Sequence, residues 1–277
     1  MDLATPQPLE SIDAGPEPAF RKHWGGWTLI WMFAAILLTF YVVQIVTTVV
    51  IIFARYGETI RHLALSGQQA ELVKLLKSPE MLGQMFNAPS LFVIQLVSTA
   101  ALVGLTWLLC RDVLGARFPD LGLGRKLTWR TAMIGVAAGI GLLLLSSALE
   151  AIQERLLGAH PQAILKVFTQ HHGAFAFVLD TCSVAVLAPF AEEFFFRGFF
   201  FTGLVQRMQL GTAALLSGFL FGLAHADLYN LVPLGVLGTG LAYVYYRSGN
   251  LWTNIVAHAT INGTQLALIF LFPAMAK

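Results

Sequence analysis

The chain has 277 residues, of which 57% are hydrophobic and only 12% are charged, and its mean hydropathy is +0.71. Soluble domains carry about 25% charged residues, so this composition excludes an ordinary soluble protein and indicates an integral membrane protein. The formal net charge is +2 and the basic residues form no dense patch, so nothing here predicts a nucleic-acid partner. The two cysteines lie in separate apolar segments without the spacing of a zinc site or a disulfide framework.

The N-terminal part of the chain divides into a tail, a first span and an amphipathic segment. The tail, residues 1–26, begins with many prolines and acids, and we expect it to be disordered. A single polytopic membrane domain, residues 27–277, follows it, and residues 27–54 are its first expected span. Residues 55–89 fit a helix on the membrane surface, a partner-binding element or a lid, and the sequence does not decide among these.

Six further apolar segments follow in the chain. They are residues 90–110, 131–148, 173–208, 211–229, 231–247 and 251–272. As one helix, residues 173–208 would measure about 54 Å, against a hydrocarbon core of about 30 Å, and Pro189 is the expected position of a kink or break. We therefore expect an all-α bundle of seven transmembrane helices, or eight if this segment forms two elements.

The loop after the second span is short and basic. It contains Arg111, Arg117, Arg125, Lys126 and Arg130. Cytoplasmic loops carry an excess of Lys and Arg, so we expect this loop and the N-terminus to be cytoplasmic. The predicted location is the cell membrane, more specifically a bacterial inner membrane, with lipids as neighbours of the helices.

Two adjacent carboxylates and an arginine interrupt the long apolar segment. Charges in hydrocarbon are costly unless they are paired or face a polar cavity, so they indicate a functional site. Glu193 and Arg197 are four residues apart with the acid first, which favours an ion pair along a helix. Glu192 lies about 100° around the helix from Glu193 and must face other groups. The alternative is a salt-bridge cluster that only holds helices together.

Partners for Glu192 are expected in the last three apolar segments. Phe221 and His225 are four residues apart on one of them, and His258 and Asn262 are four apart on the last. Each histidine alone is more often a core residue than a catalyst, but three polar sites in consecutive segments suggest a shared cavity. Together, these polar side chains would form a catalytic core within residues 173–270.

These side chains suit activation of a water and stabilisation of an oxyanion. A carboxylate in an apolar site makes a general base, and Asn or a protonated His can donate to the oxyanion. We predict no cofactor. Zinc or another divalent metal stays an alternative, with Glu192, His225 and His258 as its ligands, although no HExxH motif supports it.

Three motifs in this order, Glu192-Glu193-x-x-x-Arg197, Phe221-x-x-x-His225 and His258-x-x-x-Asn262, resemble those of the CPBP family. This family of intramembrane proteases includes CAAX prenyl endopeptidases of the Ras-converting-enzyme type and bacterial Abi proteins. The resemblance implies that Glu192 with His225 activates water and that His258 with Asn262 stabilises the tetrahedral intermediate. Glu193, Arg197 and Phe221 would support the site.

The implied activity is hydrolysis of a peptide bond in a membrane-associated, prenylated or otherwise lipidated substrate. The resemblance covers residues 187–263, and no motif identifies the N-terminal half. Two other classes of function remain open: a non-catalytic immunity or scaffold protein, and a secondary transporter that uses the intramembrane Glu, His and Arg as a proton relay.

Overall fold

The computed structural model describes residues 20, 22, 24–78, 81, 83, 85–158, 160 and 167–272. Over these residues the regular structure is helical and no strand occurs, which confirms the all-α class. Most of the predicted tail, residues 1–26, lies outside the described residues, so its expected disorder stays a prediction.

The N-terminal half contains two long helices that pack against each other and, later in the chain, a third long helix. These elements are α1 (Gly26–Leu65), α2 (Gln69–Leu76), α4 (Ala88–Leu109), the π-helical η1 (Cys110–Leu114), the 3-10 helix η2 (Phe118–Leu121) and α5 (Trp129–Leu157). The first part of the amphipathic segment, predicted separately from the first span, instead extends α1, and α2 takes up its middle.

The C-terminal half begins with one continuous helical run of 32 residues, Ala174–Val205. The run consists of α7 (Ala174–Thr181), the π-helical η3 (Cys182–Leu187), α8 (Ala188–Glu193), the π-helical η4 (Phe194–Phe201) and α9 (Thr202–Val205). Three helices follow it: α10 (Leu210–Leu223), α11 (Leu231–Ser248) and α12 (Leu251–Leu271). Because the run continues through Pro189, the alternative of two separate elements was wrong.

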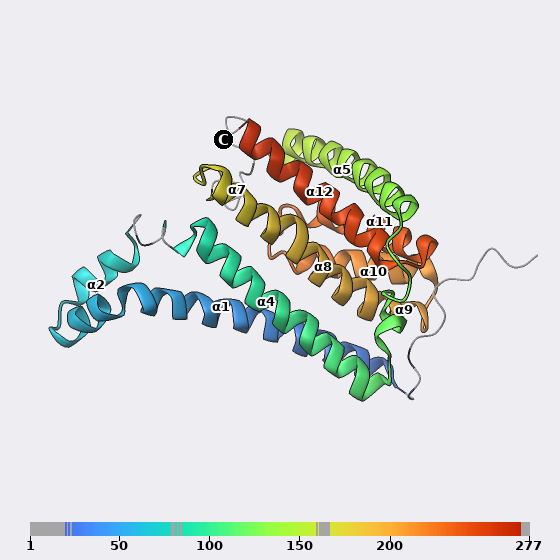
Figure 1. Ribbon diagram of the computed structural model, residues 1–277, viewed down its shortest axis with the longest axis horizontal. Helices are drawn as coiled ribbons and strands as arrows, with labels where there is room; N and C mark the ends of the chain where they lie inside the picture. Colours follow the sequence, from blue (N-terminus) through green and yellow to red (C-terminus); the bar gives the residue numbers. More distant parts are fainter. Residues whose placement is uncertain are drawn as a thin grey trace, which may run out of the picture.

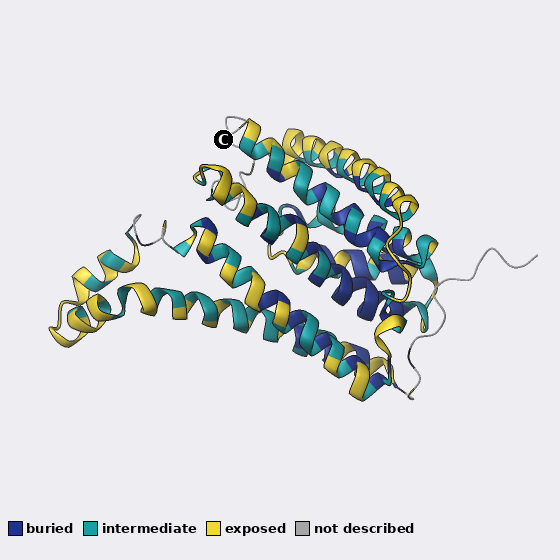
Figure 2. Ribbon diagram, in the orientation of Figure 1, coloured by how far each residue is buried: buried dark blue, intermediate teal, exposed yellow. Residues whose placement is uncertain are grey.

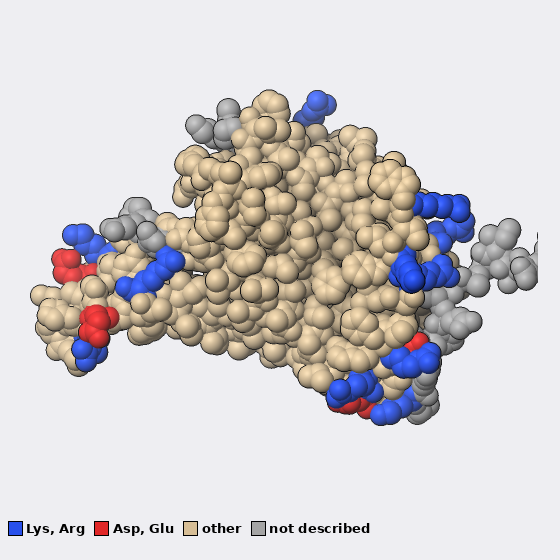
Figure 3. Space-filling view, viewed as in Figure 1, with Lys and Arg blue, Asp and Glu red and all other residues tan. Residues whose placement is uncertain are grey.

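Among the residues that the structure describes, five helices are long and apolar enough to cross a membrane. They are Gly26–Leu65, Ala88–Leu114, Trp129–Leu157, Ala174–Val205 and Leu251–Leu271. The other two expected spans correspond to the shorter α10 and to α11. Lys, Arg, Asp and Glu gather at the two ends of the molecule, and an uncharged belt separates them (Figure 3). The chain is a multi-pass membrane protein.

The long run lies between two helix pairs, and α10 packs against α11 (Figure 1). The pair α1 and α4 lies on one side of the run and the pair α12 and α5 on the other. All eight residues of η4 are buried, and the buried part of the molecule surrounds them (Figure 2). Phe33 of α1 stacks on Phe195 and also contacts Phe200, with ring centroids 5.1 and 4.3 Å away.

Glycines let neighbouring helix backbones approach closely, as small residues do in membranes. A Cβ on Gly139 of α5 would lie 2.4 Å from the carbonyl oxygen of Ala257 in α12. A Cβ on Gly218 of α10 would lie 2.5 Å from the carbonyl oxygen of Gly235 in α11. The close approach that Gly218 predicts is therefore present, and α5 is packed directly onto the helix that carries His258.

Helix α10 ends at Leu223, six residues before the predicted end of this span at 229. Residues 224–226 form a turn, and Ala226 has a φ of 53°, which ends the helical path. The Asp227 carboxylate then accepts hydrogen bonds from the backbone N–H groups of Tyr229 and Asn230, at 3.1 and 3.3 Å. This turn chemistry outweighs the apolar pattern, so His225 lies in a turn and not within a helix.

Candidate active site

Glu193 is fully buried and every one of its oxygens is hydrogen-bonded. Arg197 donates to its Oε1 over 2.8 Å, and the other guanidinium nitrogen, Nη2, donates to the carbonyl of Gly238 at 2.8 Å. The helical spacing predicted this ion pair, and neither side chain is exposed to solvent. Pairing and hydrogen bonding offset the cost of two charges in an apolar core.

Asn254 is the residue of this site that the sequence analysis missed. Its amide nitrogen donates to Glu193 Oε2 at 2.7 Å and to the carbonyl of Leu241 at 2.9 Å. Asn254 precedes His258 by four residues, so both project from one face of α12. That spacing was the available signal, an Asn-x-x-x-His-x-x-x-Asn pattern running from 254 to 262.

His258 lies between the two carboxylates. Its Nδ1 is 2.8 Å from Glu193 Oε1, and its Nε2 is 3.8 Å from Glu192 Oε2. A carboxylate accepts hydrogen bonds, so Nδ1 carries a proton that it donates to Glu193. Glu193 thereby orients the imidazole, and Nε2 faces Glu192.

Glu192 is the carboxylate that is only partly paired and partly exposed. Its side chain is 24% exposed, against 0% for Glu193, and its Oε2 has no hydrogen-bond partner. A separation of 3.8 Å between Glu192 Oε2 and His258 Nε2 is longer than a direct hydrogen bond. The sequence predicted one paired and one free carboxylate, and the geometry has this arrangement.

His225 approaches the site from the turn after α10. Its Nδ1 donates to the carbonyl of Phe221 at 2.8 Å, which leaves the Nε2 lone pair of the neutral ring free. The Phe221 ring contacts both imidazoles, with centroids 4.7 Å from His225 and 5.8 Å from His258. Among the described residues, no hydrogen bond or ion pair joins His225 to Glu192.

Asn262 is one helical turn beyond His258 on α12, and it contacts backbone. Its amide nitrogen donates to the carbonyl of Val184 in η3 at 2.9 Å. The last π-type bond of η3 runs from Ala188 N–H to the carbonyl of Ser183, so the next donor in this register would be residue 189. Residue 189 is proline and has no N–H, so Asn262 takes its place.

The predicted metal alternative has no support in this arrangement of ligands. Within the described residues, no group of three or more His, Cys, Asp or Glu side chains is placed to hold a metal ion. Glu192, His225 and His258 therefore do not converge as a ligand set in this conformation.

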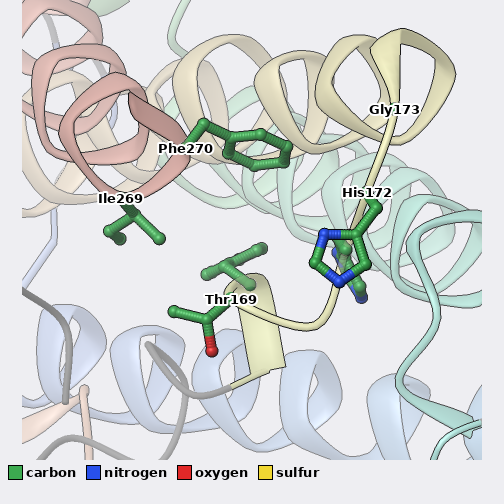
Figure 4. A pocket seen from close by; sticks show the side chains of 7 residues that line it. Thr169, His172, Gly173, Ile269 and Phe270 are labelled. Carbon is green, nitrogen blue, oxygen red and sulfur yellow. The ribbon is translucent and has the colours of Figure 1, made fainter. Parts of the chain in front are cut away.

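A hollow of about 180 Å³ lies at the other end of α12, beside the start of α7 (Figure 4). Its lining includes His172, Ile269 and Phe270. None of the predicted site residues lines it. We therefore base the candidate site on the geometry around Glu192 and not on this hollow.

Comparisons with known proteins agree with the motifs. Residues 174–264 match the family described as Rce1-like, type II CAAX prenyl endopeptidase, which confirms the resemblance to CAAX-protease-like proteins of the CPBP family over this segment. The match includes Glu192, Glu193, His225, His258 and Asn262 and excludes the six described elements that precede α7.

A relative from Bacillus subtilis (strain 168), named "Putative membrane peptidase YdiL", is 33% identical over 78 residues. The match covers 28% of this chain, and the chain spans about a third, 32%, of that relative. No solved structure matches significantly. These similarities support a membrane protease.

Proposed function

We propose that this protein is an intramembrane endopeptidase that uses Glu192 as its general base. The substrate is a peptide segment in or at the membrane, with lipidated and prenylated peptides as the first candidates. The observation that carries the proposal is the pair of Glu192 Oε2 and His258 Nε2, which face each other at 3.8 Å beside a fully paired Glu193. A structural salt-bridge cluster has no need of an unpartnered carboxylate.

The first step is attack of a water that sits between Glu192 and His258. Glu192 takes one proton of the water while the water oxygen forms a bond to the carbonyl carbon of the substrate. His225 assists with its free Nε2 lone pair.

The second step concerns the negative charge that develops on the carbonyl oxygen. His258, held with Nδ1–H on Glu193, donates from a protonated Nε2, and Asn262 donates its second N–H. When the C–N bond breaks, the protonated Glu192 gives its proton to the leaving amine. Glu193, Arg197 and Phe221 hold His258 and do not touch the substrate.

Donation from His258 Nε2 requires a proton on both ring nitrogens, because Nδ1 already donates to Glu193.

The proposal is tested with purified protein in detergent and a mixed library of peptides and lipopeptides. We expect the wild type to cleave and Glu192→Gln, which is nearly isosteric, to lose at least about 100-fold in kcat, the lower range for general-base catalysis. Glu154→Gln, on α5, is the matched control for loss of one carboxylate and should cleave as the wild type does. Cleavage by Glu192→Gln at the wild-type rate would disprove the mechanism.

Two additions to this experiment separate the alternatives. A chelator that abolishes cleavage would revive the metal hypothesis, with Glu192, His225 and His258 as the ligands to mutate next. If folded wild type cleaves nothing, solute flux in proteoliposomes that requires Glu192 would favour a transporter. Neither flux nor cleavage would favour an immunity or scaffold protein. The predicted orientation in a bacterial inner membrane, with a cytoplasmic N-terminus, is tested by labelling the basic loop in sealed vesicles.

A further inference from the structure

The site has a neighbour from the N-terminal half of the chain, outside the segment that matches the protease family. Tyr41 of α1 donates its phenolic hydrogen to the carbonyl of Ala224, the residue before His225. One side chain therefore connects α1 to the turn that carries His225.

The packing of α1 explains how Tyr41 reaches this position. Phe33 stacks on Phe195, and α1 runs antiparallel to the Ala174–Val205 run (Figure 1). Tyr41 comes after Phe33 and lies about 12 Å further along α1. Because the two helices are antiparallel, this is the same direction in which Glu192 lies from Phe195. The aromatic contacts of Phe33 thus hold α1 beside the helix that carries Glu192.

The turn that carries His225 needs such an anchor. The backbone N–H groups of residues 224–226 still donate to carbonyls of the last turn of α10. The positive φ of Ala226 then ends the helix, and the Ala224 carbonyl accepts its hydrogen bond from Tyr41 instead. On one side His225 is held by its own bond to the carbonyl of Phe221. The bond from Tyr41 fixes the backbone directly before it.

We propose that Tyr41 is a positioning residue, which holds the His225 turn opposite Glu192 through its hydrogen bond to Ala224. This inference rests on the proposed peptidase activity, because it gives α1 a part in arranging the water-activating groups. Tyr41 does not need to touch the substrate. Its loss should therefore lower kcat and leave KM nearly unchanged.

The test compares Tyr41→Phe, which keeps the ring and removes the hydroxyl, with Tyr56→Phe on the same helix. We expect Tyr41→Phe to lose about 10- to 100-fold in kcat, the effect of a small misplacement of a reacting group, with KM within about twofold of wild type. Tyr56→Phe should retain wild-type kcat. Hydrogen exchange at residues 224–226 should become faster in Tyr41→Phe only.

A double-mutant cycle shows whether Tyr41 acts through the histidine. In a His225→Ala background, Tyr41→Phe should cause no further loss of kcat, because the group that it positions is gone. Additive losses, a change confined to KM, or wild-type kcat in Tyr41→Phe would each overturn the inference. Different results would contradict the proposed peptidase activity itself: cleavage that persists in Glu192→Gln, or no cleavage by the folded wild type.

Discussion

Asn262 of α12 donates to the carbonyl of Val184 at 2.9 Å, the acceptor that Pro189 cannot serve. The motif asparagine thus joins the helix of His258 to the helix of the carboxylates through a side chain–backbone bond. It keeps a second N–H, so this structural role and the proposed oxyanion contact are compatible.

The first prediction concerns this bond. Asn262→Ala leaves the carbonyl of the partly buried Val184 without its donor and should lower the free energy of unfolding by about 1–3 kcal/mol. Pro189→Ala supplies a backbone N–H to the same carbonyl. In the double variant the stability cost of Asn262→Ala should therefore be smaller than in wild type, as measured by thermal unfolding in detergent. Equal costs in both backgrounds would contradict the assignment.

The second prediction concerns Asn254. Asn254→Ala removes the donor to Glu193 Oε2 and to the Leu241 carbonyl, and should destabilise the protein by about 1–3 kcal/mol. It should also lower kcat, because Glu193 no longer holds His258 in one orientation. Asn254→Asp should be worse, since it places a second negative charge beside Glu193. Unfolding and peptide cleavage are measured on both variants, and an Asp variant equal to wild type would refute this role.

The third prediction concerns the buried ion pair. Arg197→Gln leaves the Glu193 carboxylate buried without its cation, which should cost about 3–5 kcal/mol of stability. Arg197→Lys keeps the charge but cannot reach both Glu193 and the Gly238 carbonyl with a planar fork. We expect the Lys variant to be intermediate in thermal unfolding. A fully stable Gln variant would show that the pair contributes nothing.

The fourth prediction is a pH dependence at the turn between α10 and α11. Burial raises the pKa of Asp227, but hydrogen bonds from Asn230 and Tyr229 outweigh it and hold the pKa below its ordinary value. A lowered pKa in the folded state stabilises the protein above the unfolded pKa, and this stabilisation disappears as the pH falls through the folded value.

The measurement compares wild type with Asp227→Ala by thermal unfolding across pH. We expect wild type to be the more stable above about pH 4, the ordinary pKa of an aspartate, and the difference to shrink at lower pH. Asp112→Ala, in an exposed pair at the end of α4, controls for a general loss of negative charge. A difference that grows with falling pH would reverse the sign of the argument.

The sequence predicted those features that depend on composition or on short helical spacing. Apolar segments located the spans, and the four-residue spacing predicted the Glu193–Arg197 pair and the free Glu192. The sequence did not predict the end of α10, because the turn at Ala226 and Asp227 depends on local hydrogen bonds that compete with an apolar pattern. The contact between Asn254 and Glu193 depends on which face of α12 meets α8, and the chain alone does not reveal this.

Tyr41 is a clearer example of a contact that the sequence alone does not predict. Nothing in α1 distinguishes it from the other aromatic residues until the long run is placed beside it. Likewise, Pro189 predicted a kink or break, and the helix does not break there, because a π-helical stretch precedes the proline and another helix supplies a donor. In both cases a distant partner, and not local propensity, decides the outcome.

The two π-helical stretches of the long run, η3 and η4, have a consequence for any helical wheel drawn of it. Each π turn closes between residues five apart, so the angular phase of every later side chain shifts relative to an α-helix. A wheel drawn from Ala174 at 100° per residue would therefore assign Glu192 to the wrong azimuth. Loss of one residue within Cys182–Leu187 should return this stretch to α-helical spacing and leave both carboxylates facing His258.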